Sequence, residues 1–455
     1  MENNTGSNKA IAKLVNECES VVTDFSKELK DGLEEKKITI DNIEMLLLKT
    51  ISTLKTNLIK ATEEIVNESA LKKKEVSYCE KCGKKHVITS KSSNLVINSM
   101  LGELNLKRPW LFCRRCGEGY SPLDRELEVN ENYKVTKALV DLVCDFAQML
   151  PFQESSDVLN KHFNINMASS TIQKISEDIG KKLYLNEKKE SDELYNNQHK
   201  VIDKVIAQKK KGKLYIECDG SMVAIRGDGW REVKLGIIFS DLNVLNKNKP
   251  RHIISEKDYV AYLGTAEEFK KMLWASAVKN GCLNVEQIIF IGDGAQWIWN
   301  MVDELFPDAE KILDFYHFTE HVHDCGMVLY EDDKMRETWV KDIIDGINDG
   351  FINETLLKLN TGDYKKAAEI KEVKALKTYL ENNKERMNYK EYKEKGYFVG
   401  SGAVEGGNKC VIQQRLKLSG MRWSKEGAQY IATLRSAKKS KKWEKVKEVI
   451  YNKCA

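Results

Sequence analysis

Residues 287–294 read QIIFIGDG, and this stretch decides the fold of the chain. Its apolar run predicts a short buried strand, and the glycines on either side of Asp293 predict a tight turn where the strand ends. Residues 214–220, LYIECDG, repeat the pattern, with a strand that ends at Asp219. Each aspartate is therefore expected at the edge of a sheet.

A third acid has a related setting. Residues 400–407 read GSGAVEGG and surround Glu405 with glycines. Three carboxylates that each stand at the end of an element are the usual ingredients of a two-metal site for phosphoryl transfer. Asp219, Asp293 and Glu405 are accordingly the predicted catalytic and metal-binding residues, although by chemistry alone Glu217, Glu320 and Glu426 compete for the third place.

The order of predicted elements around these acids indicates the fold class. Three adjacent strands, at residues 214–219, 230–240 and 253–263, are followed by alternating strands and helices, which is the ribonuclease-H-like order. We therefore predict a multidomain α+β protein with a ribonuclease-H-like core at 205–330. A helical insertion is expected at 331–395, and the end of the core with a basic C-terminal helix at 396–455.

Two cysteine pairs precede the core. Cys79 and Cys82 form one CxxC knuckle, Cys113 and Cys116 form another, and a glycine follows each knuckle. This spacing predicts a four-thiolate zinc site in a zinc ribbon at residues 73–125, with a structural zinc because four thiolates leave no open position for a substrate. The alternative is four unliganded thiols.

Two helical regions complete the N-terminal part. Residues 1–72 predict helices that pack on the body of the protein or on another subunit. Residues 126–195 predict a helix, a short turn and a capped helix, which is the helix-turn-helix layout. In that layout Ser170, Thr171, Gln173 and Lys174 would face DNA; an ordinary three-helix packing unit is the alternative.

The C-terminal segment is basic, with tryptophans among its lysines and arginines. Such a surface suits a nucleic-acid backbone, whereas a solvated terminal helix is the alternative. Arg415, Lys417 and Arg422 are the residues that we predict to contact DNA there.

Composition sets the limits for these interpretations. The chain has 455 residues, which favours about three domains. Its mean hydropathy of −0.49 and the lack of a long apolar run predict a soluble protein. No signal-peptide pattern opens the chain, so we expect a cytoplasmic, nucleoid-associated location. Eleven cysteines in such a compartment favour metal binding or free thiols over disulfides.

Taken together, these motifs resemble the DDE transposases of bacterial insertion sequences. The resemblance is closest to a group long catalogued as an uncharacterised protein family and extends more distantly to the Mutator-like transposases. It covers the zinc ribbon, the helix-turn-helix, the core and the insertion. The Asp-Gly strand end matches at Asp219, the Asp-Gly-Ala segment at Asp293, and the final glutamate at Glu405. A Cys-or-Asp, two residues, then His motif matches at Asp314 and His317.

The resemblance implies an activity. It implies a transposase that binds the ends of an element and catalyses cleavage and strand transfer with Mg²⁺, or Mn²⁺, held by the three acids. Asp314 and His317 would order the site or contact the scissile strand, although a structural role remains the alternative for His317. The expected partners are double-stranded DNA and a second copy of the chain, as a homodimer or larger; no membrane partner is expected. Alternatives are a ribonuclease-H-like nuclease without strand transfer, and a DNA-binding regulator built on an inactive core.

Overall fold

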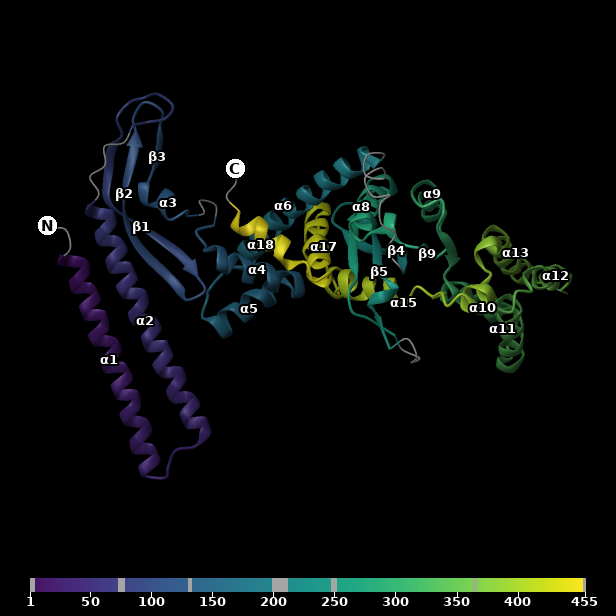
Figure 1. Cartoon of the computed structure of the whole chain (residues 1–455), viewed down its shortest axis with the longest axis horizontal. Helices are drawn as coiled ribbons and strands as arrows, with labels where there is room; N and C mark the ends of the chain where they lie inside the picture. The colour runs from purple at the N-terminus through teal and green to yellow at the C-terminus, as the bar shows by residue number, and fades with distance from the viewer. Residues whose placement is uncertain are drawn as a thin grey trace. The chain divides into compact units, whose positions relative to one another are not determined.

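The computed structural model describes residues 5–72, 78–129, 133–198, 212–246, 252–362, 364 and 366–452. They belong to two compact units (Figure 1). The first comprises Met1–Val143 and Phe152–Ile175, and the second comprises Cys144–Pro151 and Ser176–Ala455. The protein is thus multidomain and α+β, as predicted.

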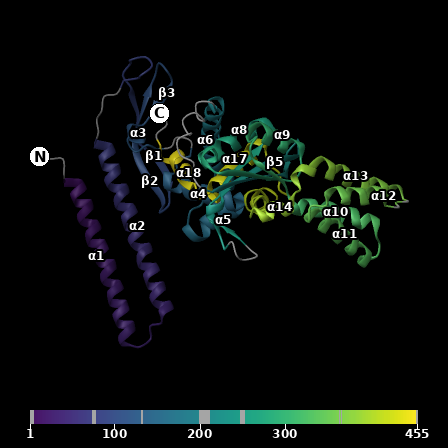
Figure 2. The same cartoon turned by 45° about the vertical axis from the view of Figure 1, so that its right-hand side comes forward.

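The first unit opens with a helical hairpin, made of α1 (Thr5–Glu34) and α2 (Ile40–Lys72). The two helices lie side by side and run in opposite directions (Figures 1 and 2). The ion pairs Lys49–Glu28 at 3.6 Å and Lys13–Glu64 at 3.4 Å fix their register. Leu46, only 8% exposed, marks the side of α2 that faces α1.

A three-stranded antiparallel sheet follows the hairpin, with strands β1 (Val87–Ser99), β2 (Gly102–Cys113) and β3 (Glu118–Tyr120). The C-terminal end of α2 packs on it. Glu63 accepts a hydrogen bond of 2.5 Å from the backbone N–H of Asn105, and Val66 packs on a core of Leu95, Ile97 and Leu106. This end of α2 is therefore anchored to the sheet. The elements that continue the chain are α3 (Pro122–Glu126), α4 (Lys137–Met149), α5 (Phe152–Phe163) and α6 (Ser169–Asn196).

The second unit is built on a five-stranded mixed sheet in the order β10-β9-β4-β5-β8. Strand β5 is antiparallel to both β4 and β8, whereas β9 and β10 add in parallel on the other side of β4. The strands are β4 (Lys213–Ile225), β5 (Gly229–Ser240), β8 (Asp258–Leu263), β9 (Gln287–Gly292) and β10 (Glu310–Leu313); a small separate pair is formed by β6 (Val244–Leu245) and β7 (Ile253–Ile254).

Helices cover the sheet. Helix α8 approaches β5 closely, because a Cβ on Gly236 would lie 2.5 Å from Leu273 Cδ1. Helix α17 contacts β8, and Gln429 on α17 both accepts from the N–H of Leu263 and donates to the carbonyl of Ala261. The covering and connecting helices are α8 (Ala266–Lys279), α9 (Gln296–Leu305), α10 (Phe315–Leu329), α15 (Gly402–Gly407), α16 (Gln414–Leu416), α17 (Lys425–Lys439) and α18 (Trp443–Tyr451), with a π-helical turn at Asn408–Gln413.

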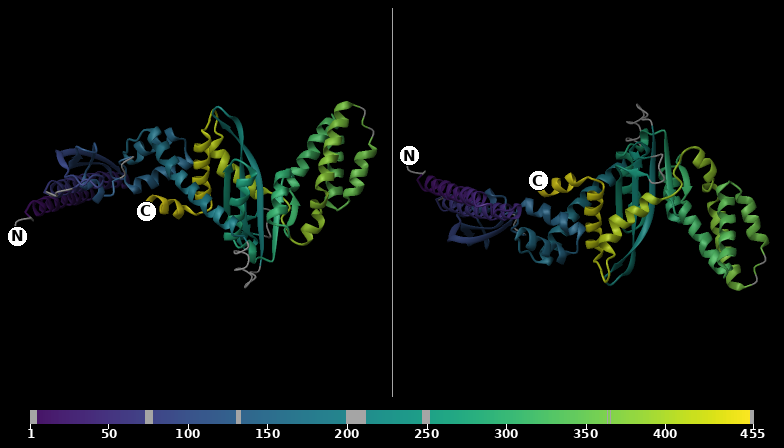
Figure 3. Two further views of the ribbon diagram at one scale, coloured as in Figure 1. Left: turned by 90° about the horizontal axis from the view of Figure 1, so that it is seen from above. Right: turned by 90° about the horizontal axis from the view of Figure 1, so that it is seen from below.

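Between α10 and α15 the chain forms the helical insertion that the sequence predicts, seen in Figure 3. Helix α10 contacts both α11 and α13, so the insertion packs back on the helix that leaves the sheet. Its helices are α11 (Asp333–Asn348), α12 (Ile352–Thr361), α13 (Ala367–Asn383) and α14 (Tyr389–Glu394). Among the described residues, no helix has the length and apolar character needed to cross a membrane.

Candidate functional site

The two predicted aspartates lie beside each other on neighbouring strands. Asp293 directly follows the end of β9, but the prediction that a strand ends at Asp219 is wrong, because β4 continues to Ile225 and Asp219 pairs with Leu235 of β5. In the parallel pair of β4 and β9, Cys218 is aligned with Gly292, so Asp219 and Asp293 both follow directly after this last pair. Asp219 Oδ1 accepts from the N–H of Gly220 at 2.6 Å, and Asp293 Oδ1 accepts from the N–H of Ala295 at 2.9 Å. Gly294 permits this turn with a φ of +96°, which side chains rarely adopt.

The two carboxylates affect one another. Burial raises the pKa of Asp219, and the negative charge of Asp293 raises it further. The Asn408 amide lowers the same pKa by donating a hydrogen bond to Asp219 Oδ2, and the nearby His317 also lowers it. A cation beside Asp219 and Asp293 would relieve this repulsion.

Helix α15, which carries Glu405, is held against the sheet edge by two other acids. Glu217 is 1% exposed, and its Oε2 accepts from the backbone N–H of Val404 at 2.8 Å. Burial raises the Glu217 pKa to about 8, although that hydrogen bond lowers it. Asp314 accepts from the N–H of Ser401 at 3.0 Å and from its hydroxyl at 2.5 Å. Carboxylates at a helix N-terminus also interact favourably with its partial positive charge.

Glycine explains how close α15 lies to the sheet. A Cβ on Gly407 would lie 2.6 Å from Ile237 Cδ1 on β5. The glycine-rich segment therefore lets the helix backbone approach the strand. Asn408, 4% exposed, then reaches Asp219 from the turn that follows.

Glu405 itself is exposed and lies three residues before Asn408, on the same side of the helix. Asp219, Asp293 and Glu405 do not gather as tightly as the cysteines. Across the residues that the structure describes, the four-cysteine cluster is the one set of three or more metal-binding groups whose ligand atoms all lie within 4.8 Å. The fold brings the two aspartates together on adjacent strands and places Glu405 on the helix that directly precedes Asn408, the residue bonded to Asp219.

Asp314 and His317 lie at the start of α10. Asp314 caps the helix by accepting from the N–H of Tyr316 at 3.1 Å, and this cap supports its structural role at Ser401. One turn after His317, His321 lies with its ring centroid 4.8 Å from that of His317. Burial lowers the pKa of His321, and the neighbouring His317 lowers it further.

The insertion contributes to the same region through Tyr379 on α13. Its ring centroid lies 4.2 Å from that of His321, and its hydroxyl donates to the backbone carbonyl of Asp293 at 3.4 Å. Tyr379 also contacts the turn that carries Asp293, since a Cβ on Gly294 would lie 3.1 Å from its ring. One side of the region next to the two aspartates is thus lined by three packed rings, those of His317, His321 and Tyr379.

Four residues of this site are absent from the sequence-based prediction: Glu217 as an anchor, Asn408, His321 and Tyr379. Two of them had a local signal. His321 follows His317 by four residues on one helix face, and Asn408 follows Glu405 by three. Tyr379 had none, because it reaches the site from a separate helix.

The four predicted zinc ligands come together in the first unit. Cys79 Sγ lies 3.8 Å from Cys116 Sγ, and Cys82 Sγ lies 3.6 Å from Cys113 Sγ. These distances exclude disulfides, whose sulfurs lie about 2.05 Å apart. They match the separation of about 3.8 Å that a tetrahedral Zn²⁺ with Zn–S bonds of 2.3 Å requires. The cluster could therefore hold a metal such as zinc.

The local backbone suits a thiolate at Cys113, whereas the hydrogen bond with Cys82 and burial raise the pKa of Cys116 to about 12. The N–H groups of Cys116 and Arg115 lower the pKa of Cys113 to about 7 despite desolvation. Gly83 and Gly117 have φ values of +67° and +72°, which the turn of each knuckle requires.

The predicted DNA-facing residues of the helix-turn-helix lie on the first turns of α6. Ser170 and Lys174 are exposed, whereas Thr171 and Gln173 are half-buried. The Lys174 ammonium lies 5.5 Å from the ring centroid of Tyr133. The contacts of these residues with DNA stay a prediction.

Of the predicted basic residues near the C-terminus, Arg415 is placed differently than expected. It is fully buried, donates to the carbonyl of Ala147 at 2.8 Å, and stacks 4.8 Å from the ring centroid of Trp423. The prediction that Arg415 contacts DNA is therefore wrong, since a buried guanidinium bonded to backbone has a structural role. Lys417 and Arg422 are exposed.

Lys417 and Arg422 line a surface groove at the tip of the β4–β5 hairpin. The groove also includes Trp230, whose side chain is 61% exposed. The carbonyl of Arg422 accepts from Arg226 Nε at 3.2 Å, which ties this loop to the hairpin. An exposed aromatic ring beside cationic side chains is a surface on which a nucleic acid base can stack.

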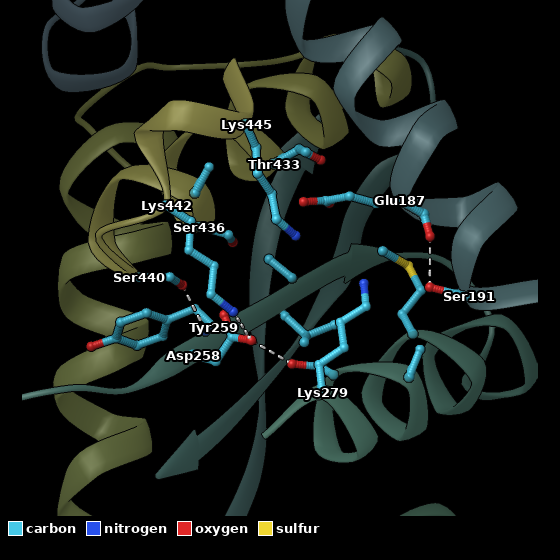
Figure 4. Close-up of a pocket in the computed structure, with 16 residues that line it drawn as sticks. Glu187, Ser191, Asp258, Tyr259, Lys279, Thr433, Ser436, Ser440, Lys442 and Lys445 are labelled. Carbon is cyan, nitrogen blue, oxygen red and sulfur yellow. Dashed lines mark hydrogen bonds and ion pairs between the residues drawn. The ribbon is translucent and has the colours of Figure 1, made fainter. Parts of the chain in front are cut away.

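A second polar cluster lies on the far strand of the sheet, around a cavity of about 50 Å³ (Figure 4). Asp258 on β8 accepts from Ser276 Oγ at 2.7 Å and from Lys442 Nζ at 2.5 Å. Glu187 from α6 points into the same cavity, and burial raises its pKa to about 7. These contacts join α6, α8, β8 and the C-terminal helices.

Comparison with known proteins gives a family. Residues 36–451 match the group described as "Uncharacterised protein family (UPF0236)". The chain belongs to this family. One UPF0236 protein of Caldanaerobacter subterraneus subsp. tengcongensis is 26% identical over 344 residues, which are 74% of this chain and 66% of that relative. A second from the same organism is 24% identical over 92% of this chain and 82% of its own. A UPF0236 protein "in vanSb 3'region" of Streptococcus gallolyticus is 23% identical over 76% of this chain and 72% of its own.

Proposed function

We propose that this UPF0236 protein is a DDE-type transposase, which binds the ends of a mobile DNA element and catalyses DNA cleavage and strand transfer. The observation that carries the proposal is the pair of aspartates that directly follow the aligned residues Cys218 and Gly292 on the adjacent parallel strands β4 and β9. Helix α15 carries a third carboxylate, Glu405. Asn408, which directly follows this helix, donates a hydrogen bond to Asp219.

The strand order supports a ribonuclease-H-like core. In chain order, the three antiparallel strands β4, β5 and β8 of the five-stranded sheet precede β9 and β10, which add in parallel. Asp219 lies within the first of these five strands, and Asp293 directly follows the fourth. A helical insertion between Asp314 and Glu405 has the place that the resemblance to transposases implies.

The donor set fits Mg²⁺. Asp219, Asp293 and Glu405 offer oxygen ligands, which Mg²⁺ prefers while keeping several waters. When bound, the metal would activate the attacking oxygen and stabilise the leaving oxygen. Asn408 orients the Asp219 carboxylate, and the three packed rings of His317, His321 and Tyr379 would bound the space for the DNA strand beside it.

The groove of Trp230, Lys417 and Arg422 would bind a DNA strand near the site. Its cations match the phosphates, and its exposed ring can stack on a base. The four-cysteine cluster would hold a structural Zn²⁺ in a ribbon, and the first turn of α6 would contact the element end, as the sequence predicts.

One relative's name also favours a mobile element. The protein from C. subterraneus subsp. tengcongensis that is 26% identical carries a name joining eleven numbered designations, from TTE0033 to TTE2212. Several designations for one protein in one organism fit a gene that is copied around a genome. If this chain has the same property, its gene would be flanked by matching ends.

The test is cleavage of a supercoiled plasmid that carries the DNA flanking the gene on both sides, with Mg²⁺ or Mn²⁺. Wild type should nick and join DNA only with metal. Asp219→Asn and Asp293→Asn should lower the rate by about 10²-fold or more, since each removes a charge that a two-metal site requires. Asp308→Asn, which removes an exposed carboxylate elsewhere in the unit, should match wild type.

Other outcomes would select another function. Cleavage without joined products would support a ribonuclease-H-like nuclease. Specific binding of the flanking DNA without any metal-dependent cleavage would support a regulator. Unchanged cleavage by Asp293→Asn would remove this residue from the site and contradict the proposal.

A further inference from the structure

The helical hairpin presents apolar side chains to solvent along one face. On α1 the side chains of Ile11, Val15, Val22 and Leu33 are 48–56% exposed, and on α2 those of Ile40, Leu47, Ile51 and Leu58 are 42–77% exposed. Single exposed apolar residues are ordinary, but eight on two adjacent helices are not. We call these eight residues the apolar face.

Helix geometry places both sets on the same face of the hairpin. At about 100° per residue, the four α2 side chains project within about 40° of one another, and so do the four on α1. On α2, the buried Leu46 marks the direction of α1. On each helix, the exposed apolar side chains point roughly 80–120° away from the direction of the other helix. On both helices this rotation has the same sense when each helix is viewed along its own chain direction. Because the helices are antiparallel, the two sets of side chains therefore lie on the same face of the hairpin.

The spacing of the α2 stripe is typical of a face that packs on another helix. Leu47, Ile51, Leu54 and Leu58 alternate steps of four and three residues, as in the seam of packed helices. Leu47, Ile51 and Leu58 are nevertheless exposed.

The size of the apolar face matches a stable interface. From Ile11 to Leu33 the face is ~33 Å long, and two helices make it ~20 Å wide. The product, on the order of 700 Å², is close to the ~800 Å² that each partner buries in a standard specific interface.

Charges at the edge of this face are self-complementary. Glu44 and Lys55 lie eleven residues apart beside the α2 stripe, and Glu19 and Lys30 lie eleven residues apart beside the α1 stripe. When a second hairpin is turned end for end against the first, each acid meets a base of the partner.

We propose that the apolar face binds the apolar face of a second copy of this chain, as a symmetric four-helix bundle. The inference rests on the hairpin alone and does not depend on the proposed transposase activity. It names the surface through which two copies, and hence two DNA ends, would be held together.

The test is sedimentation equilibrium of the full chain at micromolar concentrations. Wild type should be a dimer. Ile51→Glu and Val22→Glu should each raise the dimer Kd about 100-fold or more, because a charge would be buried against its own copy. Met45→Glu is the matched control: Met45 is 69% exposed on the opposite side of α2, so its Kd should not change. The thermal midpoint of the monomeric variants should stay close to that of the control.

Three results would overturn the inference. A monomeric wild type would show that the face does not bind a second copy. A dimer that Ile51→Glu and Val22→Glu leave unchanged would locate the interface elsewhere. A monomer whose thermal midpoint falls with both changes, but not with Met45→Glu, would show that another part of the same chain covers the face.

Discussion

The thiol cluster and the acidic edge of the sheet both gather groups that suit a cation, yet they are assembled in different ways. Cys79 and Cys116 are separated by 37 residues, and one β-hairpin brings the two knuckles together. Asp219 and Asn408 are separated by 189 residues, and strands, a helical insertion and a helix docked by two acids lie between them. The cysteine cluster, which is built locally, can form or unfold independently of the rest of the chain. The acidic site instead depends on contacts across the whole second unit.

The largest expected effect is the loss of folding of the zinc ribbon when zinc is removed from the four-cysteine cluster. Cys113→Ser, or chelation, should abolish binding of one zinc per chain and unfold β1–β3, because structural zinc contributes on the order of 10 kcal/mol to such domains. Metal analysis with circular dichroism measures both. Cys282→Ser, which changes a buried thiol of the second unit, should keep the zinc.

The comparison fails if loss of zinc also disrupts the acidic site. Mg²⁺-dependent stabilisation of the second unit should survive chelation of zinc, measured as a shift in its thermal midpoint. If chelation of zinc also abolishes the Mg²⁺-dependent stabilisation, the two sites are not independently assembled.

Glu187, a half-buried glutamate outside both sites, gives the next effect. Burial raises the Glu187 pKa to about 7, whereas an exposed glutamate titrates near 4.3. Between about pH 7 and 4.5 the folded chain binds a proton that the unfolded chain does not, so Glu187 lowers stability above pH 7 and this cost is removed as the pH falls. Glu187→Gln should therefore raise the free energy of unfolding at pH 8 by on the order of 2–3 kcal/mol and flatten its pH dependence.

Denaturant unfolding at pH 5, 6, 7 and 8 measures this difference. Glu193→Gln, an exposed change on the same helix, should follow wild type at each pH. A Glu187→Gln profile parallel to wild type would show that Glu187 keeps an ordinary pKa.

Asn408 tests the long-range assembly of the acidic site. Asn408→Ala should destabilise the second unit by about 1–3 kcal/mol, because it removes the side-chain donor to Oδ2 of the half-buried Asp219 carboxylate. Zinc content should not change. Mg²⁺ should raise the thermal midpoint of this variant more than that of wild type, if the metal replaces the lost neutralising contact; an equal shift would separate Asn408 from the metal site.

Tyr379 gives the smallest expected effect. Tyr379→Phe removes one hydrogen bond to the carbonyl of Asp293 but keeps the ring against His321, so stability should fall by about 1 kcal/mol. The cleavage rate should fall more than stability if the hydroxyl orients the Asp293 turn. Tyr364→Phe, in the same insertion, is the control.

The same contrast explains what could be predicted from the sequence. The CxxC spacing contains the whole thiol site, and the apolar runs ending at Asp219 and Asp293 contain the strand pair. The anchors of α15 were invisible, because Glu217 reads as one more residue of a strand until the partner N–H of Val404 is known. Arg415 was misassigned for a related reason: a basic, aromatic-containing stretch gives no sign of which guanidinium packs on Trp423 inside the fold.

The docking of α15 by Glu217 and Asp314 also has a consequence in time. During synthesis, β9 is complete about 110 residues before α15 begins, which corresponds to roughly 5–20 s at 5–20 residues per second. For that interval the nascent chain has both aspartates but lacks Glu405, the Asn408 amide and the helix that carries them. The acidic site is therefore completed only after α15 and the turn that carries Asn408 have been synthesised.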